Sequence, residues 1–460
     1  MRVAIWYVVR SLLVTRTRAS FAFIDSGGGI GGMLHACALG KYPDISVNVY
    51  ESSTKFSPFG AGIGVWPRAW NILCSLGLGE DMAKLTSVSP TNDPAHSFSF
   101  RKSDQLNGFT FGNLFSRGPL LTFHRAQFQQ VLAQHLAPSC RIQYSKRLKS
   151  YTQNRHGGPI YLSFEDGTQA TCDVLVGADG IKSVVRKCLL RDRAETVTNS
   201  GDRDLPSCTD YVSWIGSVAY RALIPVARLK EDCDKGLLSL PTTPTMYVGT
   251  NVHVVVYPVN KGQTLNLAVF HLRPELQGVP YCEAWSKEVE IEELLNITRF
   301  ESWETEVNLL LKHVHKPTRW AIHKVRNLPT FISDKGVALL GDAAHAASPH
   351  QGSGAGQAIE DAYFLAKLLG DPRTTLETLP RALRVYDNIR RPWTQETSAK
   401  ANANALYFTL HYDGFDFVNA DAAAATAKLH ELTDLITDNW KWCWTTTVDS
   451  SLKEALSQLG

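Results

Sequence analysis

The sequence predicts an α/β fold with three parts: a domain built on a parallel sheet, a mainly antiparallel β-sheet inserted into it, and helices at the C-terminus. Three observations predict it. An apolar strand pattern leads into glycines and a carboxylate at three places, around residues 27–51, 177–180 and 341–356. Strand patterns over 213–270 are separated by turns rather than by helices. Helical patterns dominate beyond residue 401.

These patterns divide the chain into successive segments. A polar stretch near 190–212 predicts a surface connection between the two main domains. The predicted segments are an atypical N-terminal extension (1–20), the first part of the parallel-sheet domain (21–190), the inserted sheet domain (210–325), the second part of the parallel-sheet domain (326–400) and a C-terminal helical segment (401–460).

Composition excludes several classes of protein. The 460 residues hold 47 Lys and Arg against 44 Asp and Glu, a net charge of +3, which gives no support for a nucleic-acid or membrane-surface partner. No apolar run reaches the roughly 18 to 20 residues needed to span a bilayer. The 9 cysteines are scattered singly without metal-ligand spacing, which predicts a reducing, cytoplasmic location and no metal site.

The first 20 residues allow more than one interpretation. They carry four arginines and no acid, and their apolar core is short for a secretory signal, so a mitochondrial-type targeting segment is one interpretation. The other is a segment foreign to the functional protein. Both Met1–Ile5 and Phe21–Ile24 resemble the opening strand of the same domain, and a translated intron between them would explain the repetition.

The first glycine cluster has the spacing GxGxxG, with Gly27, Gly29 and Gly32 in the three glycine positions. A helical pattern follows, then a strand that ends in Glu51, about 20 residues after the last glycine. This is the dinucleotide fingerprint, in which glycines allow close pyrophosphate approach and the acid binds ribose hydroxyls. Asp25 and the serine after it stand where an apolar strand end is expected, so the disturbed strand is the weak point of the predicted site.

Two further features favour contact with a ligand. The glycine-rich stretch 59–68, which includes Ala61 and Gly64, offers backbone that could lie against a flat ligand, although a plain loop is the alternative. Arg125 stands in the first turn of a predicted helix. A cation there is unfavourable with the helix dipole unless an anion or polar ligand pairs with it. We therefore favour a ligand-binding role for Arg125 over a solvated charge.

The other two strand ends carry the remaining acidic motifs. One strand ends in Gly177 and is followed by Asp179 and Gly180. The other is followed by Asp342 and by a small-residue loop through Pro349. Glycines at 352, 354 and 356 then open a helix, so that backbone N–H groups can approach an anionic or polar ligand. A flexible loop with a chance aspartate is the alternative.

Together and in this order, the three motifs resemble the single-component FAD-dependent aromatic hydroxylases, the group A flavoprotein monooxygenases. The stretches Gly341–Asp361 and Tyr220–Pro225 are most similar to the fungal salicylate-hydroxylase-like branch. The resemblance covers roughly residues 21 to 400 and implies a Rossmann-like FAD-binding domain with an inserted substrate domain. It also implies NADH or NADPH as a transient co-substrate.

The resemblance implies roles for individual residues around the FAD. Glu51 would hold the ribose, Arg125 would lie near the pyrophosphate or ribityl chain, and Asp342 would bind the ribityl hydroxyls. Asp179 and Gly180 would serve both FAD and the nicotinamide. The loop backbone would line the isoalloxazine ring, with these residues in contact: Pro349, Gly352, Gly354 and Ala355.

The implied reaction is reduction of the flavin by NAD(P)H, capture of O2 as a C4a-hydroperoxide and oxygen transfer to a small aromatic phenol. We expect Arg221 and Tyr257 to bind the phenolate, because a cation beside a phenol lowers its pKa. The alternative is that Arg221 pairs with a structural carboxylate and Tyr257 packs in the core. His253 and His345 are expected to be structural histidines with satisfied hydrogen bonds.

Other functions are weighed against hydroxylation. A flavin halogenase or reductase shares the fold, but the Trp-Ile-Pro box of the halogenases is absent. A non-catalytic relic that binds FAD or another ligand is suggested by the disturbed strand before Gly27. The C-terminal tryptophans between Trp440 and Trp444 are expected to pack a terminal helix rather than to form a binding box. A homodimer is left open.

Overall fold

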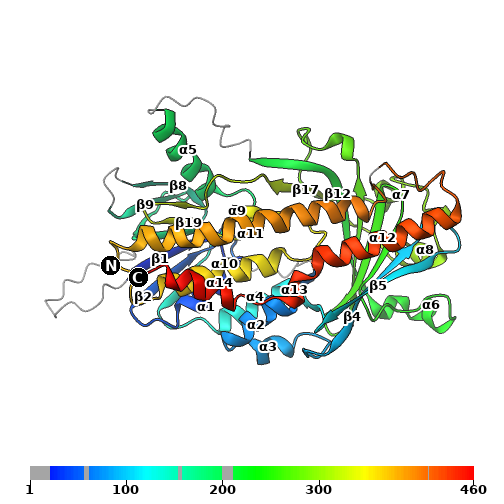
Figure 1. Ribbon diagram of the computed structural model, residues 1–460, viewed down its shortest axis with the longest axis horizontal. Coiled ribbons are helices and arrows are strands. Elements are labelled where there is room, and N and C mark those ends of the chain that lie inside the picture. Colours follow the sequence, from blue (N-terminus) through cyan, green and yellow to red (C-terminus); the bar gives the residue numbers. More distant parts are fainter. Residues whose placement is uncertain (1–20, 56–61, 154–157, 199–210, 413) are drawn as a thin grey trace.

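The computed structural model describes residues 21–55, 62–153, 158–198, 211–412 and 414–460. The predicted extension 1–20 and Ala61 lie outside the described residues. A parallel-sheet domain and a second, larger sheet lie at opposite ends of the molecule, and a long helix runs from the first toward the second (Figure 1). Among the residues that the structure describes, no helix is long and apolar enough to cross a membrane.

The first sheet confirms the predicted parallel architecture. Its strand β1 (Phe21–Ser26) is central and pairs in parallel with β2 (Ile45–Tyr50) on one side and β11 (Val174–Gly177) on the other. The full order is β18-β19-β11-β1-β2-β7, and only β18 runs antiparallel to its neighbour. The outer strands are β18 (Ile332–Ser333), β19 (Val337–Leu339) and β7 (Cys140–Gln143).

The strand before the glycine cluster is complete. Asp25 pairs with Val49 and Val176, and Ser26 pairs with residues on both sides as well. The backbone therefore carries the strand to Gly27 in spite of the polar residues, and the expected disturbance is not present in the main chain. Because β2, β11 and β19 are parallel, the acidic motifs that follow them meet at one edge of the sheet.

Two helices pack together against this sheet. All ten residues of α1 (Ile30–Leu39) are buried, and α1 lies against α10 (Gly354–Leu369). Gly31 allows this close packing, because a Cβ there would lie 3.3 Å from the Cβ of Ala358 in α10 and 2.5 Å from the side chain of Leu340. The remaining elements of this end are β8 (Leu148–Gln153), β9 (Ile160–Phe164), β10 (Gln169–Cys172), α2 (Pro67–Ser75), α3 (Gly79–Ala83), α4 (Arg125–Gln134), α5 (Val184–Thr198) and α9 (Asp342–His345).

The second sheet has eight strands in the order β16-β17-β12-β15-β14-β13-β4-β5. All neighbours are antiparallel except β13 and β4, so the sheet is mainly antiparallel as predicted. Its strands are β4 (Pro94–Lys102), β5 (Phe109–Arg117), β12 (Val212–Pro225), β13 (Thr245–Val248), β14 (Val252–Val259), β15 (Thr264–Leu272), β16 (Ser286–Glu288) and β17 (Thr318–Val325).

The sheet extends beyond the predicted segment 210–325, because β4 and β5 join it from the first part of the chain. The sequence analysis left both strands in segment 21–190. Pairing between residues as distant as Ser99 and Thr245 leaves no local pattern in the sequence. The short helices α6 (Lys230–Asp234), α7 (Ile291–Leu295) and α8 (Thr305–Lys312) lie at this end. A two-stranded ribbon of β3 (Gly62–Val65) and β6 (Leu121–His124) is paired separately.

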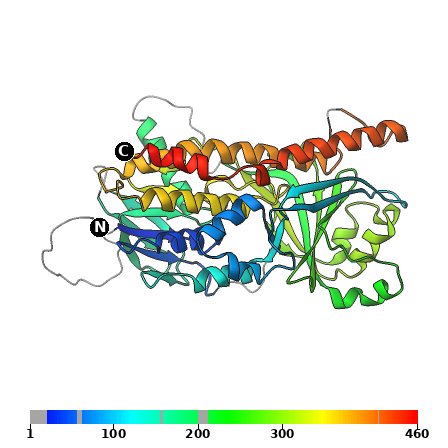
Figure 2. The ribbon, with the colours of Figure 1, turned by 60° about the horizontal axis from the view of Figure 1, so that its bottom comes forward.

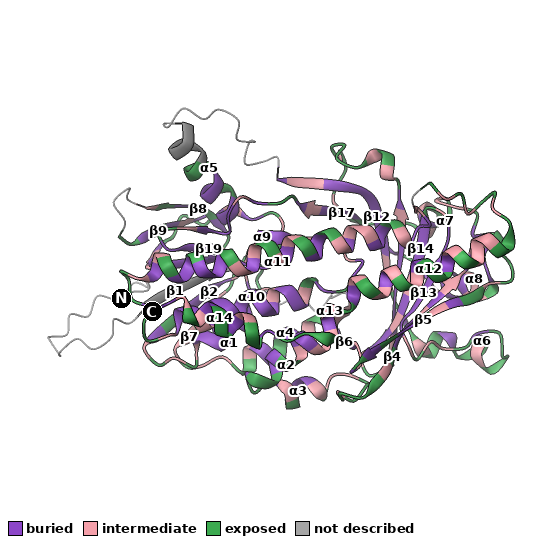
Figure 3. Cartoon of the chain, in the orientation of Figure 1, coloured by how far each residue is buried: buried purple, intermediate pink, exposed green. Residues whose placement is uncertain are grey.

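Two long helices lie along one side of the molecule. Helix α11 (Leu379–Tyr407) crosses residue 400, where the sequence analysis placed a domain boundary, and α12 (Ala422–Trp440) contacts both α11 and β5. Figure 2 shows α11 running from the parallel-sheet end toward the large sheet, with α12 on the same side over the large-sheet end. Their outward faces are exposed while α10 beneath them is largely buried (Figure 3). The chain ends with α13 (Trp442–Thr445) and α14 (Asp449–Ser457).

Candidate functional site

The first glycine cluster forms a tight turn between β1 and α1. Gly27 has φ +123°, and a Cβ on it would lie 2.3 Å from the carbonyl oxygen of Ala178. A Cβ on Gly32 would lie 2.2 Å from the carbonyl oxygen of Gly27. Nothing lies within 4 Å of the Cβ position of Gly29, which caps α1. Two glycines thus allow close backbone packing, and the third leaves space in front of the helix N-terminus.

Glu51 lies directly beside this turn. Its Oε2 accepts a hydrogen bond from the N–H of Gly28 at 2.8 Å, and its Oε1 accepts one from the N–H of Ser53 at 2.7 Å. The side chain remains partly exposed. The carboxylate is therefore fixed at the helix N-terminus, where a dinucleotide would present its ribose hydroxyls.

Arg125 approaches the same turn from α4. Gln129, one turn further along that helix, donates from Nε2 to the carbonyl oxygen of Gly28 at 2.9 Å. Residues four apart lie on one face of a helix, so Arg125 is on the face directed toward the glycine turn. Arg125 is exposed and has no ion-pair partner among the residues that the structure describes. It is available to an anionic ligand.

Asp179 is engaged by its own chain. Its Oδ1 accepts from the hydroxyl of Ser183 at 2.5 Å, and its Oδ2 accepts from the N–H groups of Val184 at 2.7 Å and Val185 at 3.1 Å. Asp179 thus satisfies the N-terminus of α5, a structural role that the sequence analysis did not propose. Burial raises the pKa of this carboxyl, and the hydrogen bonds oppose that rise. Gly180 adopts φ +72° with open space around it.

The turn at Gly341 and Asp342 is held from behind. Gly341 has φ +58°, and its N–H donates to Oδ2 of Asp361 at 2.9 Å. His345 Nε2 lies 2.5 Å from the same oxygen, and Nε of Arg390 donates to Oδ1 at 2.7 Å. Burial would raise the pKa of Asp361, but His345 and Arg390 bring it down to about 2. The expectation that His345 is a satisfied structural histidine is confirmed.

Asp342 itself is exposed at the start of α9. Within the described ranges no side chain or backbone N–H bonds its carboxylate. The residues behind it, Asp361 and Arg390, fix the backbone of the turn without using the Asp342 oxygens. Asp342 is therefore free to accept hydrogen bonds from ligand hydroxyls.

Residues 349–356 lead into α10 and are called the flavin loop here, after the role that the family resemblance implies for them. The N–H of Gly352, at φ +57°, donates to the carbonyl oxygen of Pro349 at 2.9 Å. No neighbour lies within 4 Å of the Cβ positions of Gly352 and Gly354. Helix α10 begins at Gly354 without a side-chain cap, which leaves the N–H groups of its first turn, including that of Ala355, for a ligand. A Cβ on Gly64 of β3 would lie 3.7 Å from the carbonyl oxygen of Gly352.

Arg221 and Tyr257 lie on one face of the large sheet. Tyr257 donates from its hydroxyl to the carbonyl oxygen of Gly62 at 3.1 Å, next to β3. Burial raises the pKa of Tyr257 to about 12, although Arg221 lowers it. Burial lowers the pKa of Arg221, while Tyr257 raises it and Arg125 lowers it further. No carboxylate in the described part of the chain forms an ion pair with Arg221, whose guanidinium carbon lies 5.8 Å from the ring centroid of Trp320.

His253 shares this sheet face, four residues before Tyr257 on β14. Its side chain is 1% exposed, and neither ring nitrogen has a hydrogen-bond partner among the residues that the structure describes. Its ring centroid is 4.7 Å from that of Phe270 and 5.1 Å from that of His350 in the flavin loop. The expectation of a satisfied structural histidine is therefore wrong. Buried nitrogens without partners mark a place where a ligand could supply them.

His350 completes a polar pair between the sheet and the flavin loop. Its Nδ1 also has no hydrogen-bond partner in the described part of the chain. Burial lowers the pKa of His350 to about 3 and that of His253 well below its ordinary value, so both rings are neutral near pH 7. The sequence analysis did not single out His350. Its only signal was a histidine inside a loop already expected to line the cofactor.

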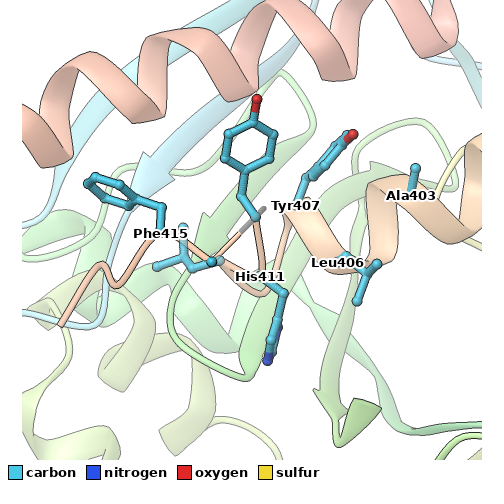
Figure 4. A pocket seen from close by; sticks show the side chains of 8 residues that line it. Ala403, Leu406, Tyr407, His411 and Phe415 are labelled. Atoms are coloured by element: carbon cyan, nitrogen blue, oxygen red, sulfur yellow. The ribbon is translucent and has the colours of Figure 1, made fainter.

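A separate open pocket of about 380 Å³ lies beside the C-terminal end of α11. Leu406, Tyr407, His411 and Phe415 are among the side chains around it (Figure 4). None of the residues predicted for the site lines this pocket, so it is distinct from the candidate site.

The described residues fit a flavin dinucleotide. The glycine turn would be blocked by a Cβ at Gly27 or Gly32, and the space before α1 is open. Glu51 lies beside the turn at the helix N-terminus, Asp342 has acceptors that no described residue uses, and α10 presents an N-terminus without a side-chain cap. A carboxylate beside the turn suits a ribose, and a carboxylate with free oxygens suits a polyol chain. An uncapped helix N-terminus suits a ring that gains negative charge on reduction.

Comparison with known proteins agrees with this assignment. The family described as "FAD binding domain" matches residues 26–401. Salicylate hydroxylase of Pseudomonas putida is 32% identical over 444 residues, covering 94% of each chain. The 6-methylsalicylate 1-monooxygenase of Aspergillus terreus is 34% identical over 392 residues, covering 83% of this chain and 81% of the relative.

A solved structure supports the same relationship. The structure described as a salicylate hydroxylase substrate complex superposes with a TM-score of 0.77 at 29% identity, and it covers 95% of this chain and 98% of that one. The resemblance read from the three motifs is thereby confirmed, together with FAD as the cofactor. The chain belongs to the FAD-binding domain family, among the FAD-dependent monooxygenases related to salicylate hydroxylase.

Proposed function

We propose that this protein hydroxylates a small phenolic aromatic substrate, of the salicylate, hydroxybenzoate or polyketide-phenol type, with NAD(P)H and O2. The observation that carries the proposal is the polar group of Arg221, Tyr257 and His253 on one face of the large sheet, where His253 lies against His350 of the flavin loop. Relatives named as hydroxylases of salicylate and 6-methylsalicylate support the substrate class. The scattered cysteines of the sequence support a cytoplasmic location as part of the same proposal.

Residues of the parallel-sheet domain would hold the cofactor. Glu51 would bind its ribose, Arg125 its pyrophosphate or ribityl region, and Asp342 its ribityl hydroxyls. Gly180 and the turn around it would contact both FAD and the nicotinamide. When bound, FAD supplies the activation of O2 that a hydroxylation requires. The N-terminus of α10 would stabilise negative charge on the ring, because a helix N-terminus carries partial positive charge and this one has no side-chain cap.

Side chains of the large sheet would prepare the phenol. No described carboxylate pairs with Arg221, so a phenolate could supply its counter-charge, and the cation would lower the pKa of the phenol. Tyr257 stays protonated at neutral pH, because its pKa is about 12. It can therefore hold the sheet against β3 through its bond to Gly62. His253 and His350 are neutral and could accept or donate a hydrogen bond to a substituent of the ring.

The alternative functions receive no support. The relic was suggested by a disturbed first strand, yet β1 is paired on both sides up to Ser26. A halogenase or a reductase is not favoured by the names of the relatives, which are hydroxylases and monooxygenases.

The proposal is tested with purified, FAD-loaded protein. A panel of phenolic acids is added while NAD(P)H consumption, hydrogen peroxide and product mass are followed, so that uncoupled oxidation is separated from hydroxylation. One or more phenols should accelerate NAD(P)H consumption and yield a product heavier by one oxygen atom. Protein that cannot be reconstituted with FAD, or that makes only peroxide with every phenol, would overturn the proposal.

Substitution of Arg221 tests the phenolate-binding role. Arg221→Ala should leave FAD bound and lower substrate-stimulated turnover by about tenfold to a hundredfold, the usual effect of removing a charged hydrogen-bond donor. Arg228→Ala, which removes an exposed arginine just after the same strand, is the matched control and should behave as the parent. Parent-level turnover in Arg221→Ala would remove this residue from the substrate site.

A further inference from the structure

One backbone carbonyl in the flavin loop is held by two tryptophans. The carbonyl oxygen of Gln351 accepts the indole N–H of Trp66 at 3.2 Å and that of Trp440 at 2.8 Å. Trp66 precedes α2 and Trp440 is the last residue of α12, so the two donors come from distant parts of the chain. Their side chains are 3% and 2% exposed. A buried carbonyl with two buried donors is strongly fixed in direction.

The ends of α11 and α12 hold the neighbouring atoms of the loop as well. The Gln351 side chain donates from Nε2 to the carbonyl oxygen of Asn439 at 2.9 Å. Asn439 donates from Nδ2 to Oδ1 of Asn404 at 2.8 Å, and Asn404 Nδ2 lies 3.4 Å from the carbonyl oxygen of His350. Two successive residues of the flavin loop are therefore tied to the C-terminal helices.

These contacts select one orientation of the peptide between Gln351 and Gly352. Its N–H donates to the carbonyl oxygen of Pro349, while its C=O accepts the two indoles. Glycine accepts φ of either sign, so without these bonds the peptide plane at Gly352 could turn over at low cost. The observed orientation, with φ +57°, leads directly into the first turn of α10.

We propose that Trp440, together with Trp66, is a positioning residue of the flavin site, through which α12 holds the flavin loop in its ring-binding conformation. Trp440 lies beyond residues 26–401, the part that the family matches. Figure 1 shows α12 ending beside α13, close to α2 and α10. The inference rests on the proposed contact between the flavin loop and the isoalloxazine ring.

Removal of single indole donors provides the test. Trp440→Phe keeps an aromatic ring and loses one N–H, so the dissociation constant for FAD should rise about threefold to tenfold, as expected for one net hydrogen bond. Titration of apoprotein with FAD, followed by quenching of flavin fluorescence, measures this constant without turnover. Trp66→Phe should act in the same direction. The double variant should exceed the product of the two effects, because it leaves a buried acceptor unpaired.

Two controls separate the hydrogen bond from packing. Trp442→Phe makes the same substitution two residues later, where the indole N–H has no hydrogen-bond partner among the described residues, and should leave FAD affinity unchanged. Phe98→Leu creates space against the Trp440 ring, whose centroid lies 5.1 Å away, without removing the donor. It should lower Tm while FAD affinity stays within about twofold of the parent.

A substitution inside the loop distinguishes failure of this inference from failure of the site. Gly352→Ala places a methyl group in open space but strains a residue at φ +57°. It should weaken FAD binding and change the flavin absorption spectrum. If Gly352→Ala has neither effect, the loop does not line the ring and the proposed site is wrong. If Gly352→Ala weakens FAD binding while folded Trp440→Phe and Trp66→Phe bind it like the parent, only the positioning role is overturned.

Discussion

Asp179 and Asp342 stand at matching places in the fold. Each follows a strand of the parallel sheet, β11 or β19, lies beside a glycine of positive φ and precedes a helix. Their oxygens have different uses. Those of Asp179 accept three hydrogen bonds from the start of α5, whereas Asp342 is exposed and is bonded by no other described residue. The same sequence signal thus serves as a helix cap at one strand end and as an unused acceptor at the next.

The two turns also differ in what holds them. The turn at Asp179 is held locally, by residues 183–185. The turn at Gly341 is held from α10 and α11, through Asp361 and Arg390. Arg390 also pairs with Glu360 at 2.7 Å, and Glu360 pairs with Arg68 at 2.9 Å. A remote, buried ionic network leaves Asp342 free for a ligand, because the backbone needs no help from its carboxylate.

Breaking the buried ion pairs of Asp361, which support the turn at Gly341, should have the largest effect on stability. Asp361→Asn keeps the side-chain shape and removes the charge between His345 and Arg390, all three being buried. The free energy of unfolding of the apoprotein should fall by about 3 to 5 kcal/mol, the usual result of leaving a buried charge without its partner. Urea denaturation of parent and variant measures the difference.

The pH dependence of the difference in unfolding free energy between parent and Asp361→Asn shows whether the charge of Asp361 causes it. The folded pKa of Asp361, about 2, lies below its ordinary value near 3.9, so its stabilising contribution is present above about pH 4 and is lost as the pH falls toward 2. The gap between parent and Asp361→Asn should narrow over that interval. Asp334→Asn, which removes one partner of an exposed ion pair with Arg384, should change stability by under about 1 kcal/mol. A gap that stays constant down to pH 2 would contradict the ionic explanation.

The parts of the fold that could be predicted have local signatures. Spacing within some 25 residues predicts the turn at Gly27, the helix after it and the position of Glu51. In the structure, Glu51 accepts a hydrogen bond from the N–H of Gly28. Strands β4 and β5 could not be assigned to the large sheet, because their partner β13 lies far along the chain. The role of Trp440 was equally hidden. Its packing was expected, but its bond to Gln351 depends on tertiary structure.

The site shows the same limit. Asp179 could have been recognised as a cap, since a serine and a helix follow it within five residues. His253 was expected to be satisfied because most buried histidines are. Whether its nitrogens find partners depends on what faces it across the domains, and that neighbour is His350, whose Nδ1 also has no partner among the described residues. Local sequence carries no information on such a pairing.

Removing the carboxylate of Asp342 should affect FAD binding rather than the stability of the fold. Asp342→Ala should weaken FAD binding by about tenfold to a hundredfold, because it deletes a charged acceptor for the ribityl hydroxyls. The apoprotein should unfold at the parent urea concentration, since no described residue bonds this carboxylate. Asp342→Asn keeps one acceptor oxygen and should lose less affinity. Parent-like FAD affinity in Asp342→Ala would remove the distinction between the two aspartates.

The smallest effect is expected for Asp179, whose oxygens accept hydrogen bonds from residues 183–185. Asp179→Ala should lower the free energy of unfolding by about 1 kcal/mol, because the first N–H groups of α5 lose their acceptor. Asp179→Ser can still cap the helix and should recover most of that loss. FAD affinity should change by less than about threefold in both, because the backbone at Gly180, not the carboxylate, faces open space. Asp179→Ala could instead weaken FAD binding as severely as Asp342→Ala. In that case the carboxylate of Asp179 both caps α5 and binds the cofactor, and its hydrogen bonds within the chain do not exclude a role in ligand binding.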